Sequence, residues 1–301
     1  MSGFPLISVC IPVFNSDATS LVNKLVNQAN FLDGRVEIVV IDDCSSADWQ
    51  LKNKSIKSIC NYVELTQNSG RSKIRNLFLN HANGTFFLFI DGDSEILSDN
   101  FLADYLNFIE KNNPEVAVGG SIYQKKRPPR SYFLRWKYSV CRESKSAKKR
   151  ERVNLGFKTN NFLIRKSVFA ETLFNETLSG YGHEDTLFGL QLSRKKIKIQ
   201  HLENPVLNKH LDSNEVFLTK TENGISNLVH MYNMSDEFPE IKEIKLIYFY
   251  DKLRQQRLIR IVSILFTIGR PLISKFLKHG YFTLWMFDFY KLGLFIRKIK
   301  S

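Results

Sequence analysis

Short apolar runs and amphipathic segments alternate along the first 120 residues of the chain. The apolar runs predict four β-strands, at residues 7–13, 36–41, 61–65 and 85–90, and the segments between them predict helices at 17–30 and 69–81. Strands that are apolar on both faces and separated by helices are typical of a parallel sheet covered on both sides. Because crossovers between parallel strands are right-handed, this order predicts a Rossmann-like, doubly wound α/β fold.

The stretch from Lys125 to Lys166 differs in character from the first 120 residues. It carries about fifteen Lys and Arg against two Glu, with Pro128-Pro129 and several aromatic residues interleaved. Such a run is either a solvated loop or a loop that binds an anion or a substrate, and the sequence leaves both readings open. Helical patterns return after Ser167 and again from about Asn214.

The C-terminal tail, residues 242–301, is basic and rich in Phe, Leu, Ile and Tyr. Residues 253–268 predict one helix with a basic face and an apolar face. The basic face has Arg254, Arg257 and Arg260, and the apolar face has Leu258, Ile261, Val262, Leu265 and Ile268. This pattern suits ordinary packing, a dimer interface or an anionic membrane surface.

The composition describes a folded, basic protein. The chain has 301 residues, 43% of them hydrophobic, and a formal net charge of +13 with a pI near 9.5. This composition excludes a disordered or fibrous chain. The charge predicts an anionic partner, which could be nucleic acid, an acidic membrane or a phosphorylated substrate. The chain shows no recognisable nucleic-acid-binding motif, so nucleic acid is disfavoured.

The cysteines and the hydropathy pattern bear on the location of the protein. The four cysteines are scattered without a CxxC pair or a zinc spacing, which fits a reducing cytoplasm. Cys10 and Cys44 stand in or beside apolar runs, so we expect them to be buried or half-buried free thiols. The N-terminus lacks a signal-peptide pattern, and no window reaches the roughly 18 apolar residues of a spanning helix. We therefore expect a cytoplasmic protein, either soluble or peripheral on the inner face of the cell membrane.

Two acidic clusters follow predicted strands. Asp91-Gly92-Asp93 comes directly after the fourth strand, where Gly92 would let a bulky ligand approach closely. Two carboxylates so close together repel each other unless a cation lies between them, and Mg²⁺ or Mn²⁺ prefers such oxygen ligands. Asp42-Asp43 follows the second strand. Both clusters can also be turn or helix-capping residues, and position at the ends of parallel strands favours a binding role.

Two further segments combine glycine with charged residues. In Asn68–Asn76, Gly70 stands near the start of a predicted helix that carries three basic side chains, which suits phosphate binding or a charged helix surface. In Gly180–Phe188, a glycine-rich turn leads to Glu184 and Asp185 at the start of another helix. Those two carboxylates are either helix-capping residues or groups presented for proton transfer.

Taken together, these segments resemble a known family. Four segments occur in the order and at the spacing seen in the donor half of family 2 glycosyltransferases. They are Ile7–Asn15, Ile41–Ser45, Asn68–Gly70 with Arg75-Asn76, and Asp91–Asp93. The resemblance covers about the first 120 residues well and continues more thinly to about residue 220. It implies the GT-A fold, a mostly parallel Rossmann-like α/β sheet flanked by helices, here with a basic helical C-terminal extension. It also implies a nucleotide-sugar-binding half at 1–120, an acceptor-binding and catalytic half at 121–220, and the extension at 221–301.

The resemblance assigns expected roles to single residues. Pro12 and Asn15 would line the nucleotide site, and Asp43 would bind the base, usually uracil. Asn68, Gly70, Arg75 and Gly92 would lie around the nucleotide sugar, with Arg75 near its phosphates. Asp91 would lie by the ribose and the metal, Asp93 would hold Mn²⁺ or Mg²⁺ on the diphosphate, and His210 would complete that site or touch the diphosphate.

The resemblance also implies the reaction. Asp185, beside Glu184, would accept the proton of the acceptor hydroxyl in one inverting displacement, with a UDP-sugar as the favoured donor. The tail resembles the C-terminal helices by which some members lie on the inner membrane leaflet. The acceptor would then be a glycan or a lipid-linked glycan, such as a polysaccharide or lipopolysaccharide precursor.

Two other functions fit parts of the sequence. A nucleotidyltransferase would also use carboxylates and a metal ion, but the Gly-rich basic loop expected after its first strand is replaced here by Pro12-Val13-Phe14-Asn15. A nucleic-acid-binding protein would account for the charge of +13, but it would leave both acidic strand ends unexplained.

Overall fold

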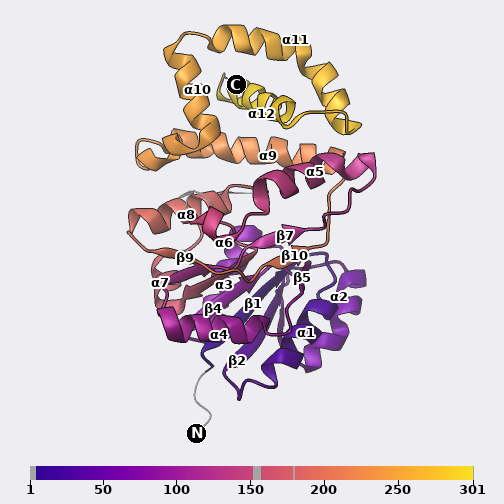
Figure 1. Cartoon of the computed structure of the whole chain (residues 1–301), viewed down its shortest axis with the longest axis vertical. Coiled ribbons are helices and arrows are strands. Elements are labelled where there is room, and N and C mark those ends of the chain that lie inside the picture. Colours follow the sequence, from indigo (N-terminus) through magenta and orange to yellow (C-terminus); the bar gives the residue numbers. More distant parts are fainter. Residues whose placement is uncertain (1–4, 152–156, 179, 301) are drawn as a thin grey trace.

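The computed structural model describes residues 5–151, 157–178 and 180–300, and it has an α/β part and a helical layer (Figure 1). Seven strands form the central sheet in the order β3-β2-β1-β4-β8-β6-β9. Their bounds are β1 Ile7–Val13, β2 Val36–Asp42, β3 Asn61–Glu64, β4 Phe86–Ile90, β6 Val116–Val118, β8 Asn161–Arg165 and β9 Ile199–His201. A second sheet, in the order β5-β10-β7, joins β5 Ser94–Ile96, β10 Val206–Asn208 and β7 Ser121–Tyr123.

The predicted parallel sheet is confirmed in the first half of the chain. Strand β1 pairs in parallel with β2 and β4, and β2 pairs in parallel with β3. The helices of this half begin later than predicted. Helix α1 (Thr19–Ala29) starts two residues after Asp17, whose carboxylate accepts the Thr19 N–H at 2.9 Å. Helix α3 (Arg71–His81) starts after Gly70, whose φ of +80° lies outside the helical region.

The basic segment 125–166 is more ordered than the solvated loop that was one reading of its sequence. It contains the α-helices α5 (Phe133–Tyr138) and α6 (Ala147–Arg150), the 3₁₀-helix η2 (Arg130–Tyr132) and the π-helix η3 (Ser139–Glu143). It also contains strand β8, which enters the sheet antiparallel to both β4 and β6. Residues 152–156 of this segment lie outside the described residues.

The two faces of the sheet bury separate apolar clusters. Val9 faces α1 and α4 (Phe101–Asn112), whereas the adjacent Cys10 faces α3, α7 (Lys166–Glu171) and α8 (Glu184–Arg194). This alternation follows from the period of two along a strand, so a run of apolar residues covers both faces. The second cluster is rich in phenylalanine, and Phe89 of β4 stacks on Phe162 of β8 with ring centroids 4.8 Å apart.

The C-terminal third forms the helical layer. Its helices are α9 (Asn214–Asn233), α10 (Lys245–Gln255), α11 (Ile259–Lys278) and α12 (Leu284–Lys300), with the turn η4 (Pro239–Glu243) before α10. Figure 1 shows α9 next to the α/β part and α11 at the far end of the molecule. Helix α9 begins at the predicted residue because the Ser213 side chain caps it by accepting the Val216 N–H.

The single helix predicted at 253–268 is wrong. The chain leaves the helical conformation at Arg257, which has a φ of +59°, and this turn separates α10 from α11. The three-residue spacing of Arg254, Arg257 and Arg260 continues through the turn, and it led to the prediction of one helix. Within the described residues, no helix is both long enough and apolar enough to cross a membrane.

The remaining elements and the cysteines complete the fold. After β2 the chain forms α2 (Ala47–Asn53) and the turn η1 (Lys54–Ser58). All four cysteines are free, as predicted, and Cys10 is buried whereas Cys44 is half-buried. Burial raises the pKa of the Cys10 thiol well above its ordinary value, so this side chain is an inert part of the core.

Candidate active site

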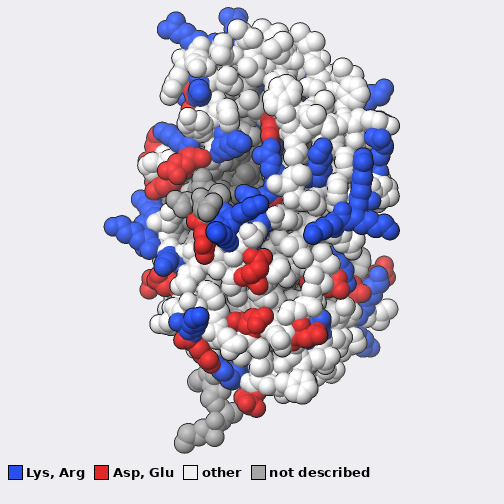
Figure 2. Space-filling model, in the orientation of Figure 1, with Lys and Arg blue, Asp and Glu red and all other residues white. Residues whose placement is uncertain are grey.

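A cavity of about 760 Å³ lies where the α/β part meets the helical layer. Figure 2 shows the surface hollowed at this level, with Lys and Arg side chains gathered around the hollow. Five of the residues predicted for the site line the cavity: Asp91, Asp93, Glu184, Asp185 and His210. They come from three separate parts of the chain, after β4, at the start of α8 and after β10. The fold therefore brings the Asp91–Asp93 pair and the Glu184–Asp185 pair into the same cavity.

The seven other predicted residues do not line this cavity: Pro12, Asn15, Asp43, Asn68, Gly70, Arg75 and Gly92. Gly92 is buried against the first strand, where an added β-carbon would lie 3.0 Å from Val13 Cγ2 and 3.1 Å from the Pro12 carbonyl oxygen. The close approach that requires glycine at this position is therefore to the protein's own backbone. Asn15 also makes internal contacts, since its Oδ1 accepts the Ser46 N–H at 2.9 Å.

Asp43 holds the loop that precedes α3. Its carboxylate oxygens accept the Ser69 N–H at 2.6 Å and the Gly70 N–H at 2.9 Å, and its main-chain oxygen accepts from Asn68 Nδ2 at 3.1 Å. Burial raises the pKa of Asp43, and the two backbone N–H groups act against that shift. Asp43, Asn68 and Gly70 therefore form one structural unit at the end of β2.

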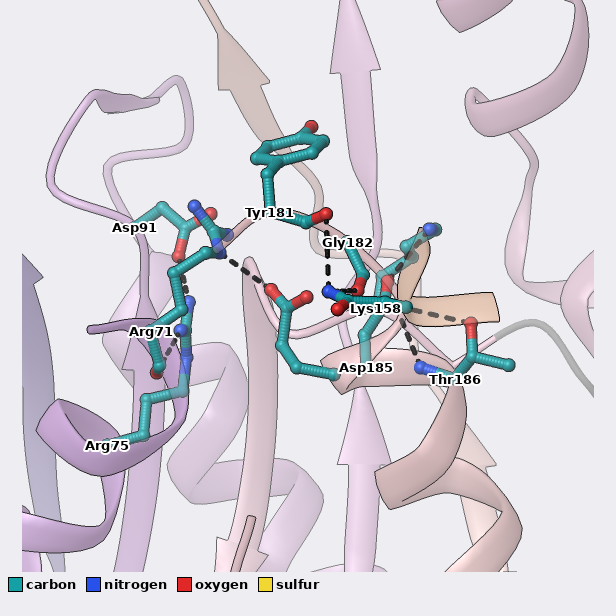
Figure 3. Close-up of polar contacts among 10 residues, drawn as sticks. Arg71, Arg75, Asp91, Lys158, Tyr181, Gly182, Asp185 and Thr186 are labelled. Atoms are coloured by element: carbon teal, nitrogen blue, oxygen red, sulfur yellow. Dashed lines mark hydrogen bonds and ion pairs between the residues drawn. The ribbon is translucent and has the colours of Figure 1, made fainter. Parts of the chain in front are cut away.

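Arg75 is buried under Asp91 (Figure 3). Its Nη2 lies 2.7 Å from Asp91 Oδ1, its Nη1 donates to the Arg71 carbonyl oxygen at 2.8 Å, and its side chain is only 2% exposed. The basic side chain that α3 presents to the cavity is instead Arg71, one turn earlier, whose Nε lies 2.6 Å from Glu184 Oε1. Arg75 was the residue predicted from this basic segment. The two arginines stand one turn apart on the same face of α3, so the sequence does not show which of them reaches the cavity.

The turn before α8 is held in place by α9. Gly182 has a φ of +100°, and a β-carbon there would lie 3.2 Å from the Cα of Gly224 in α9. Asn227 Nδ2, also in α9, donates to the Gly182 carbonyl oxygen at 2.9 Å. His183 then adopts a φ of +71° and directs the chain into α8, so that Asp185 enters the cavity from the first turn of that helix.

Asp185 is half of an ion pair (Figure 3). The Lys158 Nζ donates to Asp185 Oδ2 at 2.8 Å, and the Thr186 N–H donates to Oδ1 at 2.7 Å. Burial raises the pKa of Asp185, but the charge and hydrogen bond of Lys158, together with His183 and the Thr186 N–H, lower the pKa to about 2. Asp185 is therefore an ionised carboxylate at neutral pH. Lys158 was not predicted, because it stands in the basic segment without any local motif.

Asp93 is the carboxylate best placed to attract a cation. Its side chain is exposed at the cavity, but the protein atoms around it displace water and raise its pKa, and the neighbouring charge of Asp91 adds to the rise, whereas Arg71 and His210 lower it. Across the described ranges, no three His, Cys, Asp or Glu side chains are close enough together to hold a metal ion. One oxygen of Asp91, Oδ1, lies 2.7 Å from Arg75 Nη2.

The rest of the cavity wall comes from the basic segment 125–166 and from the helical layer, and its individual residues were not predicted. It carries further cations, each close to a carboxylate: Arg135 with Glu143 at 2.9 Å, Arg142 with Asp288 at 2.9 Å, Lys220 with Asp212 at 2.8 Å and Lys291 with Asp288 at 3.0 Å. The wall also has aromatic side chains, including Tyr181 and the exposed Trp285. Charged and aromatic side chains therefore line the cavity in addition to Asp91 and Asp93.

A family model described as glycosyl transferase family 2 matches residues 8–173, more than half of the chain. The chain belongs to this family. Membership of this family agrees with the sequence resemblance, and the nucleotidyltransferase alternative is set aside.

Curated relatives match a shorter part of the transferase. The poly(ribitol-phosphate) β-N-acetylglucosaminyltransferase TarS of Staphylococcus aureus is 35% identical over 119 residues, which are 37% of this chain and 20% of the relative. An uncharacterised glycosyltransferase of Haemophilus influenzae is 30% identical over 118 residues, 36% of this chain and 44% of the relative. The match thus spans between a fifth and less than half of the length of these relatives.

Solved structures match nearly the whole transferase. The crystal structure of residues 1–349 of S. aureus TarS has a TM-score of 0.53 at 20% identity and covers 95% of this chain and 90% of that one. The mannosyltransferase PcManGT of Pyrobaculum calidifontis has a TM-score of 0.60 at 12% identity and covers 99% and 88%. These likenesses confirm the predicted GT-A fold.

Proposed function

We propose that the transferase moves a sugar from a UDP-sugar to a hydroxyl of a glycan or a lipid-linked glycan, with Mn²⁺ or Mg²⁺ and with inversion at the anomeric carbon. One observation carries the proposal. An ionised carboxylate, Asp185, lies in the same cavity as Asp91 and Asp93, which stand at the carboxyl end of β4. A direct displacement needs this arrangement, because the base takes the proton of the hydroxyl that attacks the same sugar carbon from which the diphosphate leaves.

On the donor side, the fold of residues 1–120 presents the carboxyl ends of β1, β2 and β4. Ligands of doubly wound sheets bind there. A fold neighbour, S. aureus TarS, has been crystallised with UDP-GlcNAc, and PcManGT with GDP-Man and Mn²⁺. Those ligands belong to those proteins, and they support a nucleotide sugar as the donor of this one. We assign residues 121–220 to the acceptor and the base, and 221–301 to the helical extension.

The residues present fit a divalent cation only in part. Asp93 and Asp91 supply carboxylate oxygens of the kind that Mn²⁺ and Mg²⁺ prefer as ligands. Desolvation raises the pKa of Asp93 and the Asp91 charge adds to the rise, and a bound cation would offset both effects. His210 lies in the same cavity. Because the described residues hold no ready group of three ligands, the diphosphate of the donor would supply the missing oxygens. The cation would neutralise the charge that develops on the leaving diphosphate.

The reaction then needs one proton acceptor. As the acceptor oxygen bonds to the anomeric carbon, its proton passes to a carboxylate oxygen of Asp185. The bond from that carbon to the diphosphate breaks, and the nucleoside diphosphate leaves with the electron pair. A hydroxyl loses its proton more readily as its oxygen bonds to carbon, so a carboxylate with a lowered pKa still serves as the base late in the step. Arg71, fixed by Glu184, supplies positive charge on the same wall.

The location is part of the proposal. We place the transferase in the cytoplasm or on the inner face of the cell membrane, a location supported by its four free thiols, which stay reduced in that compartment.

Thermal shift with UDP, GDP, CDP, TDP and ATP, each with and without Mn²⁺, tests the proposal. Stabilisation by one diphosphate, UDP, that requires Mn²⁺ is the expected result. A folded sample that responds to none of the nucleotides would overturn the donor assignment. NMR of the product with the matching nucleotide sugar then reads the anomeric configuration directly, and a retained configuration would contradict the single displacement.

A further inference from the structure

Helix α11 is apolar on two faces, and the transferase itself covers only one of them. Phe266 and Leu277 point inward and are buried in the core of the helical layer. A second set of side chains points outward, which we call the α11 outer face: Ile261 (55% exposed), Ile264 (54%), Leu265 (57%), Ile268 (76%), Leu272 (59%) and Phe276 (42%). Their spacing of three and four residues keeps them on one side of the helix.

The α11 outer face is large for a surface in contact with water. It runs along most of a 20-residue helix, whose length is about 30 Å at 1.5 Å per residue. Single exposed apolar residues are ordinary, but a continuous apolar surface of this kind marks an interaction site. Figure 1 places α11 at the end of the molecule farthest from the sheet, so the α/β part cannot cover it.

The charges around the α11 outer face are of one sign. Between Asp251 and Asp288 the sequence has no Asp or Glu, and it has seven Lys and Arg: Lys252, Arg254, Arg257, Arg260, Arg270, Lys275 and Lys278. Two of them pair with α9 residues, Arg270 with Glu222 and Lys278 with Glu215. Arg257, Arg260 and Lys275 are exposed, and within the described ranges none of them has a carboxylate within ion-pair distance. In Figure 2, this end of the molecule is mostly white with blue at its edges.

We infer that α11 docks the transferase onto an anionic membrane surface, lying in the plane of the interface with its outer face among the lipid headgroups and upper acyl chains. The apolar stripe matches the acyl chains of such a surface, and the cations beside it match the anionic headgroups. A second copy of the chain is a poorer occupant, because it would bring a second set of the exposed cations Arg257, Arg260 and Lys275 toward the first set. The helix lies on the bilayer, since no described helix is suited to span one.

The inference does not depend on the proposed donor or base, although it bears on the acceptor. Trp285 of α12 and Phe249 of α10 are 75% and 46% exposed, and both line the active-site cavity. Helix α12 packs on α11 within the same apolar core. Docking through α11 would therefore bring the helical wall of the cavity to the membrane, where a lipid-linked acceptor would be presented.

Co-sedimentation of the full chain with lipid vesicles tests the inference. The vesicles are phosphatidylcholine alone, and phosphatidylcholine with about a third phosphatidylglycerol, at low and high salt. The test variant is Ile264→Ser/Ile268→Ser/Leu272→Ser, which changes only exposed side chains. Its matched control is Phe31→Ser/Leu51→Ser/Leu97→Ser, three exposed apolar residues of the α/β part. A charge variant, Arg257→Glu/Arg260→Glu/Lys275→Glu, is paired with Lys54→Glu/Lys111→Glu/Lys198→Glu, exposed lysines of the α/β part.

We expect the wild type and both controls to bind anionic vesicles, with binding weakened at high salt. Both α11 variants should lose at least about tenfold in binding. Failure of the wild type to bind, or equal binding by the serine variant, would overturn the inference. Size-exclusion chromatography gives the alternative. A wild-type dimer that the serine variant converts to a monomer would assign the face to a second copy. Nucleotide thermal shifts on the same variants should be unchanged, which separates this test from that of the proposed function.

Discussion

Lys158 Nζ lies 2.8 Å from Asp185 Oδ2, so the proposed base is already ion-paired before any acceptor is present. The two residues are 27 positions apart and meet only because the segment around Lys158 and the first turn of α8 border the same cavity. The ammonium keeps Asp185 ionised and fixes its orientation, at the cost of some basicity. This balance leads to two of the predictions below.

Replacement of Asp185 by Asn should remove the proton acceptor and leave the donor site intact. We expect Asp185→Asn to lower kcat by about 10²–10⁴-fold, the range of general base catalysis, with nearly unchanged donor affinity by calorimetry. Asp212→Asn removes a carboxylate from the same cavity and serves as the control, with a smaller effect on kcat. Loss of donor binding by Asp185→Asn would contradict its role as the base.

Replacement of Lys158 by Met should shift the acidic limb of the pH profile. Without the ammonium, burial is left as the main influence on Asp185, so its pKa should rise from about 2. We expect the acidic limb of kcat/KM to move to higher pH by at least about one unit in Lys158→Met. Lys220→Met, which removes a cation paired with Asp212, should leave that limb in place. An unmoved limb in Lys158→Met would show that another group limits the rate in acid.

The same ion pair should affect stability in acid. The folded-state pKa of Asp185 lies below its ordinary value of 3.8, so its contribution is present above that value and is lost as the pH falls toward 2. Denaturant unfolding should therefore show wild type and Lys158→Met converging in stability across this window. A constant difference between the two from pH 6 to pH 2 would argue against the pairing.

Asp43 should stabilise the protein even without a nucleotide. Its carboxylate accepts two backbone N–H groups of the Ser69–Gly70 loop, and hydrogen bonds to charged groups are worth about 1.5–3 kcal/mol each. Burial of the carboxylate offsets part of this gain, as the raised pKa of Asp43 shows. We therefore expect Asp43→Ala to lower the free energy of unfolding by a net amount of about 2 kcal/mol in the absence of ligand. If Asp43 only contacted the nucleotide base, its replacement would leave the stability of the ligand-free protein unchanged. An unchanged free energy of unfolding would therefore contradict the structural role of Asp43.

Arg75 and Asp91 form a more costly pair to break than the exposed pairs do. Arg75 is 2% exposed and Asp91 26%, so Arg75→Met should cost about 3 kcal/mol by chemical denaturation. Lys24→Met breaks the exposed pair with Asp99, at 35% and 93% exposure, and should cost less than about 1 kcal/mol. If the two variants lost the same free energy of unfolding, the buried Arg75 contacts would stabilise the protein no more than an exposed ion pair does.

Metal and nucleotide should bind together. The described residues offer no group of three ligands, so Mn²⁺ alone should bind weakly and the UDP diphosphate should strengthen its binding. Calorimetric titration of Mn²⁺ with and without UDP measures this coupling, and Asp93→Ala should abolish it. Tight binding of Mn²⁺ to the free protein would show a preformed site and contradict the reading of Asp91 as held by Arg75.

The sequence by itself determined the elements whose signals are local. The apolar run of β1 has the predicted bounds because burial on both faces demands a continuous hydrophobic strand. Helix α9 starts at the predicted Asn214, where Ser213 caps it. The Asp91-Gly92-Asp93 and Glu184-Asp185 segments were found because glycines and carboxylates at the ends of regular elements stand out from their neighbours. These signals were enough for the fold and the family.

The tertiary structure decided which side chains meet. Strand β8 lies in the basic segment that the sequence left open as a loop, and its place between β4 and β6 depends on pairing with strands more than 40 residues away. The direction of α3 buries Arg75 under Asp91 and presents Arg71 to Glu184, 113 positions along the chain. Lys158 has no motif and finds Asp185 only in space. Local propensity cannot encode such contacts, because they depend on how the whole sheet and the helical layer pack together.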